Sequence, residues 1–174
     1  TSTQVELREL QVSQADAGVF QELAGALLYT TPALRAAADE LGRNHGSLPL
    51  LWEQGISGDW PIVLASIEAQ DGLRTLRELF AAHHYWRRRG MMVDLVVLNL
   101  QPSLYLQELT NEINAGLFGS SDAGMLDRPG GVFMRRKDLL KPETLLMLRA
   151  TARVHVTCDG QPLERTARRG RSQE

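Results

Sequence analysis

The first apolar pattern of the chain has the period of an α-helix. Phe20, Leu23 and Leu27 recur at three- and four-residue steps, which places them on one helical face. Ser13 stands just before this stretch and is a suitable N-cap. Pro32 interrupts the pattern, because proline fits the first turn of a helix but not its interior. The N-terminal part of the chain is therefore predicted to form two consecutive helices that meet near Pro32.

Four later segments have the apolar character of buried strands. Residues 60–67 and 93–100 are nearly continuous apolar runs, which is typical of strands that are covered on both faces. Residues 131–136 and 153–158 are shorter candidates, and the last of them alternates apolar with polar positions. Between the strands, helices are predicted at residues 73–89, from Ser103 to about residue 117, and from Pro142 onward.

This order of elements predicts an α/β fold. An N-terminal helical segment is followed by a small, mostly parallel four-stranded sheet with helices on both faces, because strands joined through helices run parallel. The expected divisions are a helical lead-in at residues 1–46, an α/β domain at 47–160 and a basic tail at 161–174. Few apolar residues occur in the tail, so we expect it to be disordered and to act as a solvated linker rather than a nucleic-acid arm. The sequence leaves the strand order open.

Composition narrows the function classes. The chain has 174 residues, of which 43% are hydrophobic, and a formal net charge of −2. A packed globular core is expected, and no overall positive field attracts nucleic acid. The sequence contains neither a signal peptide nor the roughly 18 to 20 apolar residues that span a bilayer, so we expect no direct membrane contact. Because the chain begins at Thr1 without an initiator methionine, we interpret it as a piece of a longer polypeptide.

No motif supplies a complete catalytic, metal or cofactor site. Ligands favour the carboxyl ends of parallel strands, but the segments that follow the predicted strands lack a nucleophile, a base or a phosphate-binding glycine pattern. Gly55, Gly58 and Asp59 lie in a glycine-rich turn that precedes a strand and lacks a following Lys-Ser or Lys-Thr. We predict a structural turn in which Asp59 accepts backbone hydrogen bonds. Asp94, within an apolar run, is predicted to be an ion-pair or capping partner.

The histidines and the cysteine also favour structural roles. His83 and His84 are adjacent, and neighbours on a helix point about 100° apart, so the two cannot grip one ion. Cys158 is the only cysteine, and His155 faces the opposite side of the same predicted strand. We therefore predict no catalytic residue, no metal ligand and no cofactor.

Aromatic side chains provide the remaining candidates for binding. A flat ring can stack on the apolar face of a sugar, although aromatics beside apolar strands more often pack in the core. The candidate carbohydrate-binding residues are Trp52, Trp60, Tyr85 and Trp86.

Several longer strings are specific enough to indicate a family. The main string is residues 51–64, which contains the glycine-rich turn. The others are residues 20–24, 27–29, 82–87 with Gly90, 93–99, then Ser103, Tyr105, Gln107 and Leu109, 130–133 with Arg135, and 152–154. Together they resemble cyclic β-1,2-glucan synthases over nearly the whole chain, from about residue 15 to 163. Trp60 and Leu100 depart from the family pattern, which has leucine and glutamate there, and the second departure weakens any claim for an acid at that strand end.

The resemblance implies a very large enzyme of the bacterial inner membrane that makes cyclic β-1,2-glucan from UDP-glucose. Its C-terminal half is similar to cellobiose phosphorylase, and the present segment would lie between two β-sandwich modules, ahead of the helical-barrel domain expected to hold the general acid and the phosphate site. None of those catalytic motifs occurs in this sequence. The resemblance therefore assigns no catalytic residue, and it implies neighbouring domains of the parent polypeptide as partners and a position on the cytoplasmic side of the membrane.

Three functions follow from these observations. The first is a non-catalytic connecting or scaffold domain of the synthase, which is a glycosyltransferase. The second is a carbohydrate-binding module that recognises β-glucan. The third is an independent small α/β enzyme, which requires a pocket with convergent polar groups at the carboxyl ends of the strands.

Overall fold

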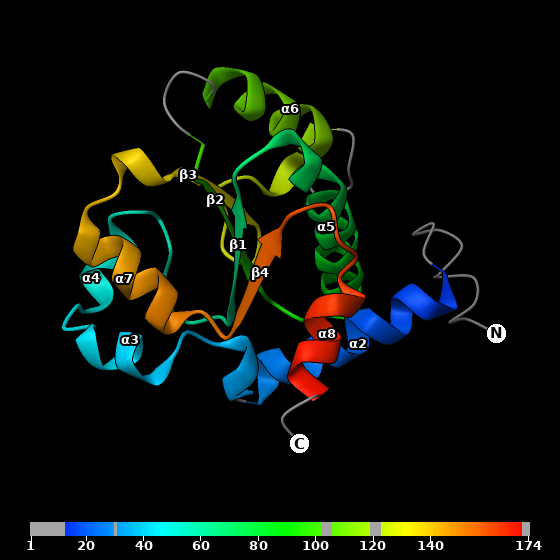
Figure 1. Ribbon diagram of the computed structural model, residues 1–174, viewed down its shortest axis with the longest axis horizontal. Coiled ribbons are helices and arrows are strands. Elements are labelled where there is room, and N and C mark those ends of the chain that lie inside the picture. Colours follow the sequence, from blue (N-terminus) through cyan, green and yellow to red (C-terminus); the bar gives the residue numbers. More distant parts are fainter. Residues whose placement is uncertain (1–12, 30, 102–105, 119–122, 172–174) are drawn as a thin grey trace.

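A computed structural model describes residues 13–29, 31–101, 106–118 and 123–171. N-terminal helices precede a four-stranded, all-parallel sheet with interleaved helices, as the sequence predicts (Figure 1). Ser103, the predicted cap of a helix, lies outside the described residues. Among the helices described, none is both long and apolar enough to cross a membrane.

The sheet contains β1 (Ile62–Ile67), β2 (Asp94–Asn99), β3 (Val132–Arg136) and β4 (Val154–Cys158). The strand order is β3-β2-β1-β4, so β1 and β2 are central and the other two strands form the edges. Every residue of β2 is buried, which explains why its sequence lacks polar alternation.

Helices cover both faces of the sheet (Figure 1). One face carries α2 (Gln14–Leu28), α5 (Leu73–Arg88), α6 (Leu106–Phe118) and α8 (Glu164–Arg171). The other face carries α4 (Leu48–Trp52) and α7 (Pro142–Thr151), with α3 (Ala38–Arg43) against α7.

The direction in which successive strands are added to the sheet reverses after β3, and β4 is placed next to β1. From β1 the chain passes through α5 to β2 and through α6 to β3, with both helices on one face. It then returns through α7 on the opposite face and places β4 on the far side of β1. In doubly wound sheets this reversal marks the position where ligands bind beyond the carboxyl ends of the strands.

The lead-in differs from two simple helices. Ser13 caps α2 as predicted, because its Oγ accepts a hydrogen bond from the amide of Asp16 at 3.0 Å. After the proline, only a short 3-10 turn at Pro32–Leu34 forms, and the chain is extended at Arg35 before α3 begins. The turn positions the Arg35 side chain against α7, where its Nη2 donates to the carbonyl of Ala150 at 2.6 Å.

The prediction of a disordered tail is wrong for Glu164–Arg171, which form helix α8 beside α2 (Figure 1). Leu163 and Ala167 are buried against the core, and Arg171 pairs with Glu22 of α2 at 3.1 Å. The two apolar residues lie four positions apart and therefore share one side of the helix, while the arginines occupy the solvated sides.

Candidate functional site

The crevice between β1 and β4, where the fold would place a ligand, is filled by the protein itself. A Cβ on Gly72, which precedes α5, would collide with the backbone carbonyl of Cys158 at the end of β4. Thr75 Oγ1 donates to the carbonyl of Gln161 at 2.7 Å and accepts from the amide of Gly160 at 2.9 Å. These contacts join the first turn of α5 to the loop that follows β4.

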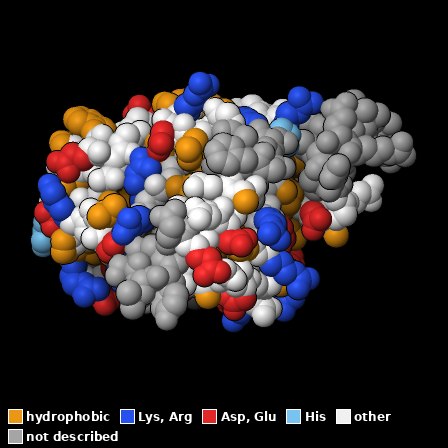
Figure 2. Space-filling model, turned by 90° about the horizontal axis from the view of Figure 1, so that it is seen from above, with side chains coloured by type: hydrophobic (Ala, Val, Ile, Leu, Met, Phe, Trp, Pro, Cys, Tyr) orange, Lys and Arg blue, Asp and Glu red, His pale blue; other side chains and the backbone are white. Residues whose placement is uncertain are grey.

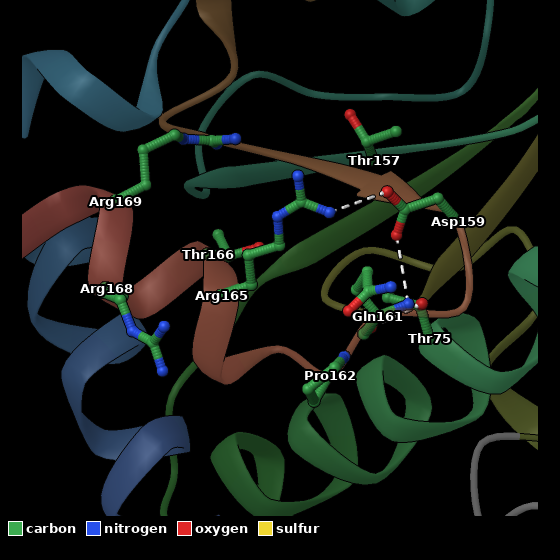
Figure 3. Close-up of a pocket in the computed structure, with 9 residues that line it drawn as sticks. All are labelled: Thr75, Thr157, Asp159, Gln161, Pro162, Arg165, Thr166, Arg168 and Arg169. Atoms are coloured by element: carbon green, nitrogen blue, oxygen red, sulfur yellow. Dashed lines mark hydrogen bonds and ion pairs between the residues drawn. The ribbon is translucent and has the colours of Figure 1, made fainter.

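A pocket of about 580 Å³ opens instead on the outer side of β4, against α8 (Figure 3). Its lining is polar and basic, and consists of Thr75, Thr157, Asp159, Gln161, Pro162, Arg165, Thr166, Arg168 and Arg169. In Figure 3 the Arg165 side chain extends to Asp159, and Arg169 reaches across from the next turn of α8. Convergent polar groups therefore lie at the carboxyl end of one edge strand, although they include no nucleophile paired with a base.

Two arginines of this pocket contact neighbouring polar groups. Arg165 Nη1 pairs with Asp159 Oδ2 at 3.3 Å, and Arg169 Nη2 donates to the carbonyl of His155 at 2.7 Å. Partial burial and the positive charge of Arg165 lower the pKa of Arg169. The positive charges of Arg165 and Arg169 are therefore close enough to influence each other.

A second pocket, of about 400 Å³, lies at the amino ends of β1 and β4. Asp59 and Trp60 line it together with Asn44, Arg35 and Arg153. It combines an indole ring with a carboxylate, an amide and two guanidinium groups. Such a set can stack on a sugar ring and hydrogen-bond its hydroxyl groups.

The glycine-rich turn leads into this second pocket. Gly55 and Gly58 have φ values of 77° and 82°, a region that favours glycine. The backbone amide of Asp59 donates to Ser57 Oγ at 3.1 Å, while the predicted role of its carboxylate as an acceptor stays a prediction. Trp52 Nε1 donates to the carbonyl of Ser57 at 3.0 Å, so the turn also fixes the first indole ring.

The four aromatic candidates divide into two pairs. Trp52 is 58% exposed and Trp60 is 40% exposed, so each offers a ring to solvent. Tyr85 and Trp86, by contrast, are 2% exposed and must be reassigned to the core. Trp86 Nε1 donates to the carbonyl of Phe20 at 2.8 Å, while Tyr85 Oη accepts from the side chain of Gln21. Helix α5 lies between the sheet and α2, which covers both rings.

Two buried titratable groups, Asp94 and Cys158, are not among the residues that line the two pockets. Asp94 is fully buried at the start of β2, and its Oδ1 accepts a hydrogen bond from the amide of Gly130 at 2.7 Å. Burial raises the pKa of Asp94. Burial likewise raises the pKa of Cys158 to about 12, which keeps the thiol protonated and a poor nucleophile at neutral pH. In the part of the chain that the structure describes, no three His, Cys, Asp or Glu side chains are grouped to hold a metal ion.

The chain is 34% identical over 154 residues to the cyclic β-(1,2)-glucan synthase NdvB of Rhizobium meliloti (strain 1021). The chain is related to a segment of a cyclic β-1,2-glucan synthase. The match covers 88% of the chain but only 5% of the relative, so the chain corresponds to a small part of that protein. No protein-family model matches the chain.

Sequence reasoning missed both pockets of this synthase-related segment. The basic pocket depends on helix α8, whose composition predicts a solvated tail. The pocket beside Trp60 gathers residues that are far apart in the sequence, among them Asn44 and Arg153. Two features of the sequence could have indicated these pockets. They are the arginine content of the tail and the adjacent Asp59 and Trp60 in the family-like string.

Proposed function

We propose that the chain is a non-catalytic connecting domain of a cyclic β-1,2-glucan synthase, in which it positions neighbouring domains of the same polypeptide. The observation that carries this proposal is the relation of 88% of the chain to a segment that makes up 5% of such a synthase. In the synthase the segment would stand on the cytoplasmic side of the inner membrane without touching the bilayer.

The packing of the first and last described helices supports a connecting role. Helices α2 and α8 contact each other, and Arg171 of α8 forms ion pairs with Glu22 and Glu164. The polypeptide therefore enters and leaves the body on one face of the sheet. Flanking domains joined to these helices would be held in a defined relation, because both helices are anchored by buried side chains such as Phe20 and Leu163.

The chemistry of the described residues supports a non-catalytic role. The crevice between β1 and β4 is closed by Gly72 and Thr75, and the buried Cys158 thiol stays protonated. The remaining buried acid, Asp94, is at the amino end of the sheet, away from where parallel sheets bind ligands.

The test compares two kinds of change in the full-length synthase. Deletion of residues 50–158 removes the body of the domain and should reduce the amount of folded enzyme or change the ring size of the cyclic glucan. The point variant Asp94→Asn, which keeps the acceptor for Gly130, should leave the turnover of folded enzyme unchanged. Unchanged yield and ring size after the deletion would refute the connecting role, and a turnover defect in the folded Asp94→Asn enzyme would refute the non-catalytic one.

A second candidate function is β-glucan binding at the pocket beside Trp60. The specific observation in its favour is that an exposed indole borders a cavity with Asp59, Asn44 and two arginines. Trp52, at the end of α4, is tied to the same turn because its Nε1 donates to the carbonyl of Ser57, and its ring is also exposed.

Titration of the 174-residue chain with linear β-1,2-glucan oligosaccharides tests this second function. The NMR signal of the Trp60 indole should shift and saturate, and Trp60→Ala should abolish the binding. Leu139→Ala removes an apolar side chain that is 71% exposed elsewhere on the surface, and it should leave the titration unchanged. The absence of a saturable shift would contradict the binding function without affecting the connecting role.

A further inference from the structure

We propose that the basic pocket between β4 and α8 binds a small molecule that carries a phosphate group, with Arg165 and Arg169 as its main charge partners. This inference stands apart from the connecting function, since it rests only on the residues of the pocket. The basic pocket is the 580 Å³ cavity drawn in Figure 3.

The charge of the basic pocket is unbalanced. Three arginines line it against one carboxylate, that of Asp159. This contrasts with the surface in Figure 2, where acidic and basic side chains are interspersed over the described part of the face. Concentrated positive charge inside a concave surface attracts anions more strongly than the same charge on a flat surface.

The geometry of α8 creates this charge cluster. Arg165 and Arg169 are four residues apart, so they lie on the same side of the helix, one turn from each other. Both extend toward β4, whereas Arg168 projects to another side of the helix and borders the pocket there (Figure 3). Partial burial and, to a smaller extent, the charge of Arg165 lower the pKa of Arg169, and an anion placed between the guanidinium groups would offset the repulsion between them.

A phosphate group fits the donors that line the pocket. Guanidinium groups bind phosphate oxygens in bidentate fashion, and hydroxyl groups such as that of Thr157 can complete the shell. The cavity is larger than a bare phosphate needs and falls within the range of about 300 to 1,000 Å³ that is typical of small-molecule sites. The space therefore suits a phosphate ester with an organic part.

Asp159 competes with the proposed ligand. Its ion pair with Arg165 joins side chains that are 67% and 42% exposed, and such solvated pairs are weak. A doubly charged phosphate can therefore displace the carboxylate from Arg165. The carboxylate also accepts a hydrogen bond from the amide of Gln161 at 3.1 Å, which an asparagine oxygen at this position could retain.

The experiment is a calorimetric or ³¹P NMR titration of the 174-residue chain at constant ionic strength. The probes are inorganic phosphate and glucose 6-phosphate, with glucose as the uncharged control. Saturable binding of either phosphate probe but not of glucose is expected. Tighter binding of the ester would assign the rest of the cavity to the organic part, while equal affinities would assign the site to phosphate alone.

Matched variants locate the site. Arg165→Gln and Arg169→Gln should each weaken binding by about tenfold or more, as expected for the loss of a charge-assisted hydrogen bond. Asp159→Asn should strengthen binding, which a purely structural role of Asp159 would not produce. Arg128→Gln removes an exposed arginine beside β3, at the opposite edge of the sheet, and should have no effect.

Circular dichroism of each variant establishes that it is folded. The proposal is overturned if neither phosphate probe binds saturably, if glucose binds as well as its phosphate ester, or if Arg128→Gln weakens binding as much as Arg165→Gln in folded proteins.

Discussion

Gly72 lies directly against the backbone carbonyl of Cys158, which joins the start of α5 to the end of β4 without space for a side chain. A Cβ at this position would also lie 2.9 Å from Cγ1 of Ile67. The φ angle of Gly72 is −69°, so the requirement for glycine comes from contact and not from backbone conformation.

Gly72→Ala should therefore lower the free energy of unfolding by about 1 to 3 kcal/mol, since the backbone of β4 cannot move aside cheaply. Urea denaturation measures the change. The control is Gly18→Ala in α2, where a Cβ meets nothing within 4 Å, and it should raise stability by up to about 1 kcal/mol through helix propensity. Equal effects of the two substitutions would contradict the close contact.

Leu163→Ala tests whether α8 belongs to the folded body. Leu163 is fully buried, and its removal should destabilise the chain by roughly 2 to 5 kcal/mol, as for other large-to-small core changes. Leu139→Ala deletes the same atoms from a side chain that is 71% exposed and should change stability little. If both variants unfold at the same urea concentration as the parent chain, α8 does not pack as described.

Asp94 should make the chain less stable as the pH rises. Its pKa is raised in the folded state from an ordinary value of 3.8, mainly by burial, so the folded chain binds a proton that the unfolded chain has already lost. Stability is consequently greatest below the ordinary pKa and falls as the pH increases through the raised one. Nearby Asp59 adds to the shift, whereas His83 and the amide of Gly130 oppose it.

Asp94→Asn should remove this contribution, and the difference in unfolding free energy between the two proteins should vary as the pH rises above the ordinary pKa of 3.8. Asp94→Ala is the companion variant, because it leaves the buried amide of Gly130 without its acceptor and should cost about 1 to 3 kcal/mol. A difference between parent and Asp94→Asn that stays constant with pH would show that Asp94 has an ordinary pKa.

The ion pair of Glu40 and Arg149 makes stability depend on pH in the opposite direction. Arg149 donates to Glu40 through Nε and, at 3.1 Å, through Nη2, and this hydrogen bonding lowers the pKa of Glu40. The stabilisation is present above the ordinary carboxyl pKa of 4.5 and disappears as the pH falls through the lowered value. Glu40→Gln should therefore cost about 1 kcal/mol at neutral pH and less in acid, with the value kept modest because Arg149 is 39% exposed.

A double-mutant cycle with Arg149→Gln measures the pairwise energy, and Glu112→Gln, at an exposed position of α6, is the control for loss of a carboxylate. A coupling energy of zero would mean that α3 is not fastened to α7 by this pair.

The sequence predicts the elements of the sheet well because burial on both faces leaves a direct signature. The continuous apolar run that becomes β1 can be placed without knowledge of its neighbours. The strand order has no such signature, since each crossover can carry the chain to either side of the preceding strand. The reversal that puts β4 beside β1 is therefore visible only in the structure.

The candidate sites were harder to predict because they depend on which faces of a helix are covered. Tyr85 and Trp86 are adjacent, so a helix with a single buried face could not hide both rings, but α5 is covered by the sheet and by α2. For α8 the apolar signal is limited to Leu163, which directly precedes the helix, and the small Ala167 within it. The same segment contains four arginines, so its composition is typical of a solvated tail. For this reason the sequence does not reveal the helix that forms one wall of the pocket.

The position of β4 at the edge beside β1 also determines how the chain can fold during synthesis. β1, β2 and β3 can pair as soon as they leave the ribosome, but one side of β1 keeps open hydrogen-bonding groups until residues 154–158 emerge. Helix α2, the first of the described helices, likewise waits for α8, the last of them. Because open strand edges recruit other chains, translation arrested before Val154 should yield an aggregating intermediate, which the arrival of β4 then protects.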